Sequence, residues 1–375
     1  MPGALCLRDK SDPATFVQWS AEVTASSIRL ERMKAVGYKV PLPIDDPEAL
    51  LDIELPEPVA RDRDLLVEVR AISVNPVDTK QRKSAKPDEG KTYKVLGWDC
   101  AGVVVGKGKQ TSMFKVGDEV FYAGCIARQG TNAQLHTVDE RIVAHKPRSL
   151  SFAEAAALPL TSLTAWELLF DRFNVEQRRI SYNAPRKGSI LIIGAAGGVG
   201  SMLVQMASRL TPLTVVATAS RPETTDWCRQ MGAHYVIDHH RDIRTQMQEL
   251  GLGEVEYIAL LSGTDTHYPG IAELMAPQGK IGIIDDPQKP VDARPLKRQS
   301  ASVHWEWMFT RSYFETPDIL RQHDSLTEVS KLVDLNTLRT TMTQNYGVIN
   351  AQNLKVAHAW IESGRSLGKI VLEGW

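Results

Sequence analysis

The sequence has few cysteines, and their spacing matches no common disulfide or zinc pattern. Four occur in 375 residues: Cys6, Cys100, Cys125 and Cys228. No two of them form a Cys-x-x-Cys pair, which argues against a disulfide framework and against a structural zinc knuckle. Scattered thiols are typical of proteins in a reducing compartment. We therefore expect a cytoplasmic protein.

The chain also lacks an excess of charge of one sign and a long apolar run. It has 44 basic and 45 acidic residues, so its formal net charge is -1. A protein with so little net charge does not attract nucleic acid or an anionic membrane through its overall field. No apolar run approaches the roughly 18 to 20 residues that a membrane helix needs. We predict a small-molecule partner, with no nucleic acid and no membrane.

Residues 1–32 lack the apolar segment of a secretory signal peptide. They contain basic residues and several Ser and Thr, but also Asp9, Asp12, Glu22 and Glu31, which contradict the acid-poor composition of transit peptides. We expect a flexible N-terminal extension, and a transit peptide stays the alternative.

Short β-type segments follow this extension. They are MKAVGY, DLLVEVRAISVN, CAGVVVGKG, DEVFYAG and RIVAHKP. Their β-branched alternation and the Gly or Pro residues between them predict a small antiparallel barrel or sandwich. From Ser151 the apolar spacing of SFAEAAALPLTSLTAWELLF becomes helical, and Ser151 with Glu154 forms a capping box. A helix should therefore open a second domain.

Strands and helices alternate beyond this point. The segments are SILIIG, VGSMLVQMASRL, TVVATAS, TTDWCRQMG, YVID, RTQMQEL, VEYIALL, IAELMAPQG (expected as a helix) and KIGIID. Short apolar strands separated by helices are typical of parallel βαβ units. The sequence thus predicts a doubly wound α/β domain. Because the closing strand GKIVLEG has the pattern of the first module, we expect the chain to return and complete that module.

The clearest motif is a glycine turn between the strand SILIIG and the helix that follows it. In the AxGxxG pattern of Ala195, Gly197 and Gly200, Gly197 lets backbone approach a pyrophosphate and Gly200 lets the helix pack closely on the strand. The helix N-terminus adds free N–H groups and a positive dipole end. A turn that merely packs is the alternative, but its three glycines in four positions cost backbone entropy. We predict that Ala195, Gly197, Gly198, Val199 and Gly200 bind a dinucleotide.

The end of the next strand indicates which dinucleotide. About 20 residues beyond the glycine turn, NAD-binding enzymes place an acidic residue on the ribose diol, whereas this chain has Ala219, Ser220 and Arg221. No carboxylate repels a 2′-phosphate there, and a guanidinium makes charge-assisted hydrogen bonds of about 1.5 to 3 kcal/mol. We predict NADPH, bound through Ser220 and Arg221. The alternative is a solvated Arg221 in a site indifferent to the phosphate.

These motifs resemble the medium-chain dehydrogenase/reductase superfamily, and within it the zinc-free quinone oxidoreductase branch. The similar segments are SVNPVD, LGWDCAGVV, VGDEVF, AALPLTSLTAWE, GAAGGVG and LGKIVLEG, while HWEWMFTR and DHH resemble the subgroup of zinc-type alcohol dehydrogenase-like proteins. The resemblance implies an α/β protein with a GroES-like catalytic domain at residues 33–158 and a Rossmann NADP-binding domain, a doubly wound parallel sheet, at residues 159–311. Residues 312–375 would form the C-terminal return that completes the catalytic domain.

The resemblance also implies roles for single residues. Asn75 would lie near the nicotinamide, Thr161 by the cofactor at the domain junction, and Lys369 would reach the pyrophosphate. The alternatives are a turn residue, a helix-interior hydroxyl and a surface charge. Lys80 stands where many quinone reductases carry a tyrosine, so we take Lys80 and Asn75 as the catalytic candidates, with a surface lysine as the alternative for Lys80.

The zinc ligands of the related alcohol dehydrogenases are replaced in this chain. Asn75, Trp98 and Leu160 or Thr161 stand at the positions of the catalytic Cys, His and Cys, and the lobe of four structural cysteines retains Cys125 alone. Such side chains do not substitute for thiolate and imidazole in a tetrahedral zinc site. We predict that no metal is bound, which removes the Lewis acid that polarises an alcohol or carbonyl oxygen.

The leading function hypothesis is therefore hydride delivery from NADPH to an electrophilic carbon of a quinone or an α,β-unsaturated carbonyl. An NADP-dependent alcohol or aldehyde dehydrogenase and a non-catalytic NADPH-binding protein are the alternatives. Trp98, Trp305, Met308 and Phe309 form either an apolar wall for a flat substrate or simple core or dimer packing. Because the ASVHWEWMF stretch would be an exposed sheet edge, we expect a homodimer.

Overall fold

The computed structural model describes residues 32–178 and 185–375. Arg32 begins the first strand, and the rest of the N-terminal extension predicted from the sequence lies outside the described residues. The strands are β1 (Arg32–Tyr38), β2 (Leu51–Pro56), β3 (Asp64–Val74), β4 (Lys94–Val95), β5 (Asp99–Lys107), β6 (Glu119–Ala123), β7 (Leu135–Asp139), β8 (Val143–His145), β9 (Ser189–Ile193), β10 (Thr214–Thr218), β11 (Tyr235–Ile237), β12 (Val255–Leu260), β13 (Met275–Ile283), β14 (Ser302–Trp305), β15 (Met342–Asn345) and β16 (Lys369–Glu373).

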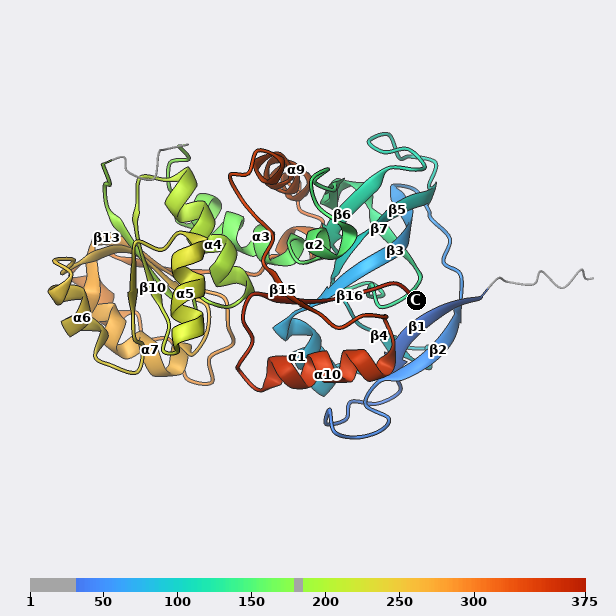
Figure 1. The fold of residues 1–375 in the computed structure, drawn as a ribbon, viewed down its shortest axis with the longest axis horizontal. Coiled ribbons are helices and arrows are strands. Elements are labelled where there is room, and N and C mark those ends of the chain that lie inside the picture. Colours follow the sequence, from blue (N-terminus) through green and yellow to red (C-terminus); the bar gives the residue numbers. More distant parts are fainter. Residues whose placement is uncertain (1–31, 179–184) are drawn as a thin grey trace, which may run out of the picture. The chain divides into compact units, whose positions relative to one another are not determined.

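The helices alternate with the strands mainly in the middle of the chain (Figure 1). They are α1 (Pro76–Ser84), α2 (Phe152–Ala156), α3 (Pro159–Trp166), α4 (Gly198–Leu210), α5 (Pro222–Met231), α6 (Ile243–Glu249), α7 (Thr264–Ile271), α8 (Thr310–Tyr313), α9 (Arg321–Asp334) and α10 (Ala351–Glu362), with a π-helical turn at Glu167–Arg172. No helix of the described ranges is long and apolar enough to cross a membrane.

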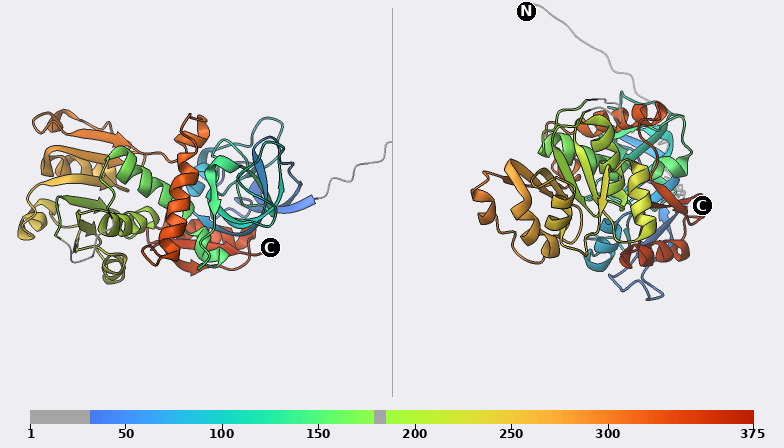
Figure 2. Two further views of the ribbon diagram at one scale, coloured as in Figure 1. Left: turned by 90° about the horizontal axis from the view of Figure 1, so that it is seen from above. Right: turned by 60° about the vertical axis from the view of Figure 1, so that its left-hand side comes forward.

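The β-rich module contains two sheets. A three-stranded sheet has the order β2-β1-β4, and a seven-stranded sheet has the order β15-β16-β3-β5-β6-β8, with β7 paired to β3. The closing strand β16 runs antiparallel to β3, with Ile370 opposite Val74. The chain therefore returns to this module at its end, and α9 stands between the module and the α/β sheet (Figure 2).

The α/β domain is built on a six-stranded parallel sheet of order β11-β10-β9-β12-β13-β14. Alternate residues of β9 face opposite sides of this sheet, because side chains alternate along a strand. Ile190 and Ile192 pack in the core that includes α4, while Leu191 and Ile193 pack in the core that includes α6 and α7. Helices thus cover both faces, which confirms the predicted doubly wound α/β fold.

One predicted helix is interrupted. The capping box is confirmed: Ser151 Oγ accepts the Glu154 N–H at 3.2 Å, and the Glu154 carboxylate accepts the Ser151 N–H at 2.9 Å. However, α2 ends at Ala156 and α3 begins at Pro159, followed by the π-helical turn. Proline lacks an N–H and its ring clashes with the preceding helical turn, so the single long helix that we expected was wrong.

The segment IAELMAPQG was also predicted wrongly as a helix. The helix α7 ends at Ile271 and β13 begins at Met275, so most of the segment forms a strand. The real helix lies earlier and contains Pro269, a residue that normally marks a turn. Sequence reasoning also left β2, β7, α1 and α10 unassigned.

Candidate active site

The carboxyl ends of the parallel strands border a cavity. Because β9 pairs with β10 on one side and with β12 on the other, a crevice opens where their ends diverge. A cavity of about 540 Å³ lies there. Its lining is Val74, Asn75, Pro76, Leu160, Thr161, Gly194, Ala196, Gly197, Gly198, Val199, Gly200, Thr218, Ala219, Ser220, Arg221, Thr224, His239, His240, Leu261, Ser262, Ile284, Ile361, Gly364, Ser366, Gly368, Lys369 and Ile370. Residues 74–76 of the β-rich module, residues 361–370 near the C-terminus and residues of the α/β domain therefore share one site.

The glycine turn lines this cavity. A Cβ on Gly200 would stand 2.5 Å from Ala195 Cα, so this glycine allows α4 to pack against the turn. A Cβ on Gly197 would meet a single atom within 4 Å, the Gly194 carbonyl oxygen at 3.5 Å. Gly197 therefore leaves open space for a ligand at the start of α4 (Gly198–Leu210), as the motif predicts. Ala195 is fully buried and lies behind the cavity lining.

Lys369 lies beside this turn, but its ammonium points elsewhere. A Cβ on Gly198 would stand 2.8 Å from Lys369 Cδ, so the aliphatic stem covers the turn. The Nζ donates to the Val74 carbonyl at 2.9 Å, to Asn75 Oδ1, and to Asp99 Oδ2 at 3.1 Å. An ammonium has three N–H donors, and all three are used. The predicted reach of Lys369 toward a pyrophosphate is therefore not seen in this structure.

Asp99 lies outside the cavity lining and holds two of the lining residues, Asn75 and Lys369. Its carboxylate is buried and accepts hydrogen bonds from Asn75 Nδ2 at 2.7 Å, from Ser73 Oγ at 2.7 Å and from the Leu160 N–H at 2.8 Å, besides the Lys369 ammonium. Asn75 thus donates to an anion and accepts from a cation, and both contacts require the same orientation of its amide. The carboxamide of Asn75 is held rigidly at the cavity wall.

Burial shifts the protonation of the groups around Asn75. Asp78 Oδ2 accepts the Asn75 N–H at 2.8 Å. Burial raises the pKa of Asp78 to about 7, although the Asn75 N–H and the Lys369 charge act in the opposite direction. Burial lowers the pKa of Lys369, against the attraction of Asp99. A carboxyl and an ammonium with opposed shifts in one cluster are typical of functional sites.

Thr161 lies at the junction that the resemblance implied. It is buried on α3, its hydroxyl donates to the Leu158 carbonyl at 3.0 Å, and it lines the cavity. A Cβ on Gly198 would stand 2.9 Å from Thr161 Cγ2. Its methyl group therefore packs against the glycine turn, while its hydroxyl is satisfied within the helix.

Arg221 and Ser220 also line the cavity. The Arg221 guanidinium contacts Glu223 at 2.7 Å and donates to the Arg365 carbonyl at 3.3 Å. These contacts hold the Arg221 guanidinium beside the cavity. His239 and His240 line the same cavity, which our sequence analysis did not foresee, although their position directly after the strand β11 was a usable signal.

Lys80 lies outside the cavity lining. Its ammonium pairs with Asp286 at 2.6 Å, and half of its side chain is exposed. The aromatic residues considered as a substrate wall lie elsewhere too: Trp98 and Phe309 are buried and pack edge to face at 5.9 Å, whereas Trp305 is 55% exposed. Trp98 and Phe309 therefore belong to the core.

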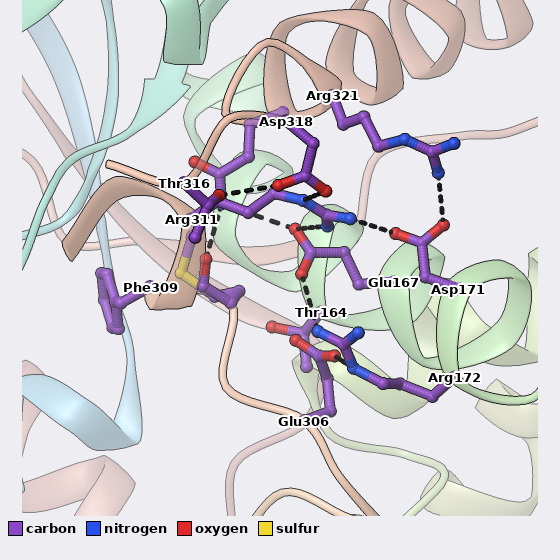
Figure 3. A network of polar contacts seen from close by, with 12 residues as sticks. Thr164, Glu167, Asp171, Arg172, Glu306, Phe309, Arg311, Thr316, Asp318 and Arg321 are labelled. Carbon is purple, nitrogen blue, oxygen red and sulfur yellow. Dashed lines mark hydrogen bonds and ion pairs between the residues drawn. The ribbon is translucent and has the colours of Figure 1, made fainter. Parts of the chain in front are cut away.

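Figure 3 shows a network of acids and arginines, none of which lines the cavity. Arg311 binds Glu167 at 2.9 Å and Asp171 at 2.9 Å, and Arg172 binds Glu306 at 2.7 Å. Glu306 is 3% exposed, and burial together with the neighbouring Glu167 charge raises its pKa to about 9. The network joins the π-helical turn to the chain that follows β14.

Potential metal ligands do not cluster in the parts of the chain that the structure describes. Within residues 32–178 and 185–375, no three His, Cys, Asp or Glu side chains are placed to hold a metal ion. Asn75 is instead occupied by the Asp99 and Lys369 contacts.

Comparisons with known proteins agree with this architecture. Residues 61–164 match the model of the alcohol dehydrogenase GroES-like domain, and residues 231–372 match that of the zinc-binding dehydrogenases. A zinc-type alcohol dehydrogenase-like protein of Staphylococcus aureus is 40% identical over 91% of this chain and 99% of its own length. A 2-methylene-furan-3-one reductase of Solanum lycopersicum is 34% identical over 60% of this chain and 57% of its own. A crystal structure from Rhizobium etli, described as a zinc-dependent alcohol dehydrogenase protein, has a TM-score of 0.86 and 52% identity, covering 92% of this chain and 99% of that one.

Proposed function

Because this chain belongs to the medium-chain dehydrogenase/reductase superfamily of oxidoreductases, we propose that it is a zinc-independent, NADPH-dependent reductase of quinones or α,β-unsaturated carbonyls. The observation that carries the proposal is that one cavity is lined both by an open glycine turn and by Arg221. Neither end of this cavity offers a carboxylate to a ribose diol among the lining residues.

The residues around the cavity fit a dinucleotide. The N–H groups at the start of α4 would hold the diphosphate, because a helix N-terminus carries partial positive charge. Arg221 and Ser220 would hold the 2′-phosphate through charge-assisted and neutral hydrogen bonds. Gly197, with open space where a Cβ would stand, permits close approach of the diphosphate.

Bound NADPH supplies a hydride to an electrophilic carbon. The protein itself contributes by positioning the reactants and by placing polar side chains beside them. Asn75, fixed by Asp99 and Lys369, presents its carboxamide beside the cavity, and such preorganised dipoles stabilise developing charge without reorganisation. Lys80 stays a predicted proton donor, although it lies outside the cavity lining and its ammonium pairs with Asp286.

The proposed substrate class rests on the residues that stand where the related alcohol dehydrogenases have their zinc ligands. With Asn75, Trp98 and Leu160 or Thr161 at those positions, a simple alcohol oxygen has no Lewis acid to ionise it. A conjugated carbonyl needs less activation, because its double bond is already polarised. The name of the Solanum relative specifies 2-methylene-furan-3-one, a compound in which a carbon–carbon double bond adjoins a carbonyl.

The test is a fluorescence titration with NADPH and with NADH, together with metal analysis of the same sample. Preferential NADPH binding without stoichiometric zinc, followed by NADPH oxidation with enones or quinones, supports the proposal. The Arg221→Ala variant should lose about ten- to hundredfold in NADPH affinity, whereas Arg229→Ala, an exposed change on α5, the helix that follows Arg221, serves as the control. Turnover of simple alcohols with NADP⁺ would instead indicate a dehydrogenase, and tight binding with no turnover a non-catalytic protein.

We further propose a cytoplasmic homodimer. The strand β14 ends the parallel sheet, and the exposed Trp305 lies on it. Exposed sheet edges of this kind are usually covered. Trp305→Glu on β14 should shift a dimer toward monomer in sedimentation velocity, whereas Val348→Glu, at an exposed residue outside this sheet, should not. Cell fractionation tests the location.

A further inference from the structure

Two histidines, His239 and His240, line the same cavity as Arg221. β10 and β11 are parallel neighbours, with Thr218 opposite Ile237. The chain segments that follow these two strands therefore emerge at the same sheet edge. Arg221 belongs to the first segment, and His239 and His240 belong to the second, and all three line the cavity.

The imidazole of His239 has unused hydrogen-bonding capacity. Its Nδ1 is buried and has no hydrogen-bond partner within the described residues. Its ring lies 4.4 Å from the ring of His240 and 6.0 Å from that of His267 on α7, measured between centroids. A buried ring nitrogen without a hydrogen-bond partner is costly, so His239 has the capacity to bind a polar group of a ligand.

The charges that face His239 come mainly from cationic groups. His240, His267 and Arg221 all lower its pKa, after the larger effect of burial, and Asp238 alone acts in the opposite direction. The Asp238 carboxylate also accepts a hydrogen bond from the backbone N–H of His240 at 2.9 Å.

Two further carboxylates lie near this group. Glu223 pairs with Arg221 at 2.7 Å. Asp285 raises the pKa of His267, against burial and the His240 charge, and also accepts from Thr264. Both carboxylates already make these contacts, and a bound dianion would add counter-charge beside the imidazoles.

We propose that His239 and His240, together with Arg221, form a proton-linked recognition site for the 2′-phosphate of NADPH. This inference rests on the NADPH preference proposed above, and it adds that binding of the phosphate is coupled to proton uptake by the histidines. A phosphate monoester stays dianionic above about pH 6, and an imidazolium beside it is stabilised by the opposite charge. Affinity for NADPH therefore rises as the pH falls from about 8 to about 6.5. NADH has a ribose hydroxyl at this position, so its affinity lacks this coupling.

Calorimetric titration of the full chain provides the test. Adenosine 2′,5′-bisphosphate and NADPH are compared with 5′-AMP and NADH at about pH 6.5 and pH 8, in buffers of different ionisation enthalpy, so that proton uptake is measured directly. We expect the two 2′-phosphorylated ligands to bind about fivefold or more tightly at the lower pH, with uptake of a fraction of a proton, and the other two ligands to change less than twofold.

The double variant His239→Gln/His240→Gln should remove most of the pH dependence and the proton uptake. His145→Gln, an exposed histidine paired with Asp118 away from the cavity, is the matched control. Melting temperatures of both variants show whether they are folded, and each single variant identifies the histidine that takes up the proton.

The outcomes separate the two proposals. NADPH preference that is independent of pH, or a pH dependence that survives in the double variant, overturns the histidine site and leaves the proposed function in place. Equal affinity for NADPH and NADH at every pH overturns the proposed NADPH specificity itself.

Discussion

The ammonium of Lys369 lies 3.1 Å from the carboxylate of Asp99, and both side chains are buried. The two residues come from β16 and β5, on either side of the central strand β3. Two buried charges are tolerated when they are paired and fully hydrogen-bonded. The pair therefore ties the last strand of the chain to the wall that carries Asn75.

Replacing Lys369 by Met should leave the Asp99 carboxylate buried without its cation. We expect a loss of about 3 to 5 kcal/mol in the free energy of unfolding, because an uncompensated buried charge is strongly unfavourable. Urea denaturation measures it. Lys331→Met, on an exposed side chain of α9, is the control.

The double variant Lys369→Met/Asp99→Asn should recover part of this loss, since it removes both charges. If Lys369→Met is as stable as the control variant, the pair contributes no stability and Asp99 is satisfied by its three neutral donors alone.

Gly200→Ala should disturb the glycine turn. Its Cβ would stand 2.5 Å from Ala195 Cα and from two carbonyl oxygens, which are backbone atoms that cannot move aside cheaply. We expect a lower melting temperature and at least a tenfold weaker affinity for the dinucleotide. Gly270→Ala on α7 has open space for its Cβ and should be neutral or slightly stabilising, as Ala is favoured over Gly in helices. Unchanged binding by Gly200→Ala would contradict the assigned turn.

Glu306 should make the protein less stable as the pH rises. Its pKa is raised from 4.5 to about 9 by burial and by Glu167, so the folded protein keeps a proton that the unfolded chain releases. The stabilisation is complete below about pH 4.5 and is lost as the pH rises toward 9. Glu306→Gln should flatten the decline in urea midpoint between about pH 6 and pH 9. A variant that declines as steeply as the unmodified protein would show that Glu306 is ionised when folded. Glu249→Gln, at an exposed position on α6, is the control.

His358 should make the protein sensitive to acid. It is buried on α10, neither of its ring nitrogens has a hydrogen-bond partner among the described residues, and burial lowers its pKa from 6.5 to about 3. The unfolded chain therefore binds a proton that the folded protein excludes, and stability present above about pH 6.5 is lost as the pH falls toward 3.

His358→Leu removes both the orphan nitrogens and this coupling. We expect its thermal midpoint to exceed that of the unmodified protein by more at about pH 5 than at about pH 8. An identical difference at both pH values would mean that His358 is not the titrating group. The exposed His145→Gln change controls for a general effect of removing a histidine.

Much of the fold was predictable because its signals are local. The alternation of β9 and the helical period of α4 each lie within a few consecutive residues, and Gly197 and Gly200 stand in a fixed spacing between them. Such patterns predict parallel βαβ units whatever the rest of the chain does. The two wrong helix predictions arose where a proline conflicted with the local pattern. Pro159 interrupts a helical pattern, and Pro269 lies inside the helix α7.

The sequence by itself determined the fold class, the glycine turn and the residues Ser220 and Arg221 at the end of β10. The tertiary structure decided where the Lys369 ammonium points and which histidines join Arg221. Lys369 and Asn75 are 294 residues apart, and they meet because β16 pairs with β3 in one register, with Ile370 opposite Val74. Register between distant strands depends on packing of the whole sheet, so no short segment of the chain encodes it.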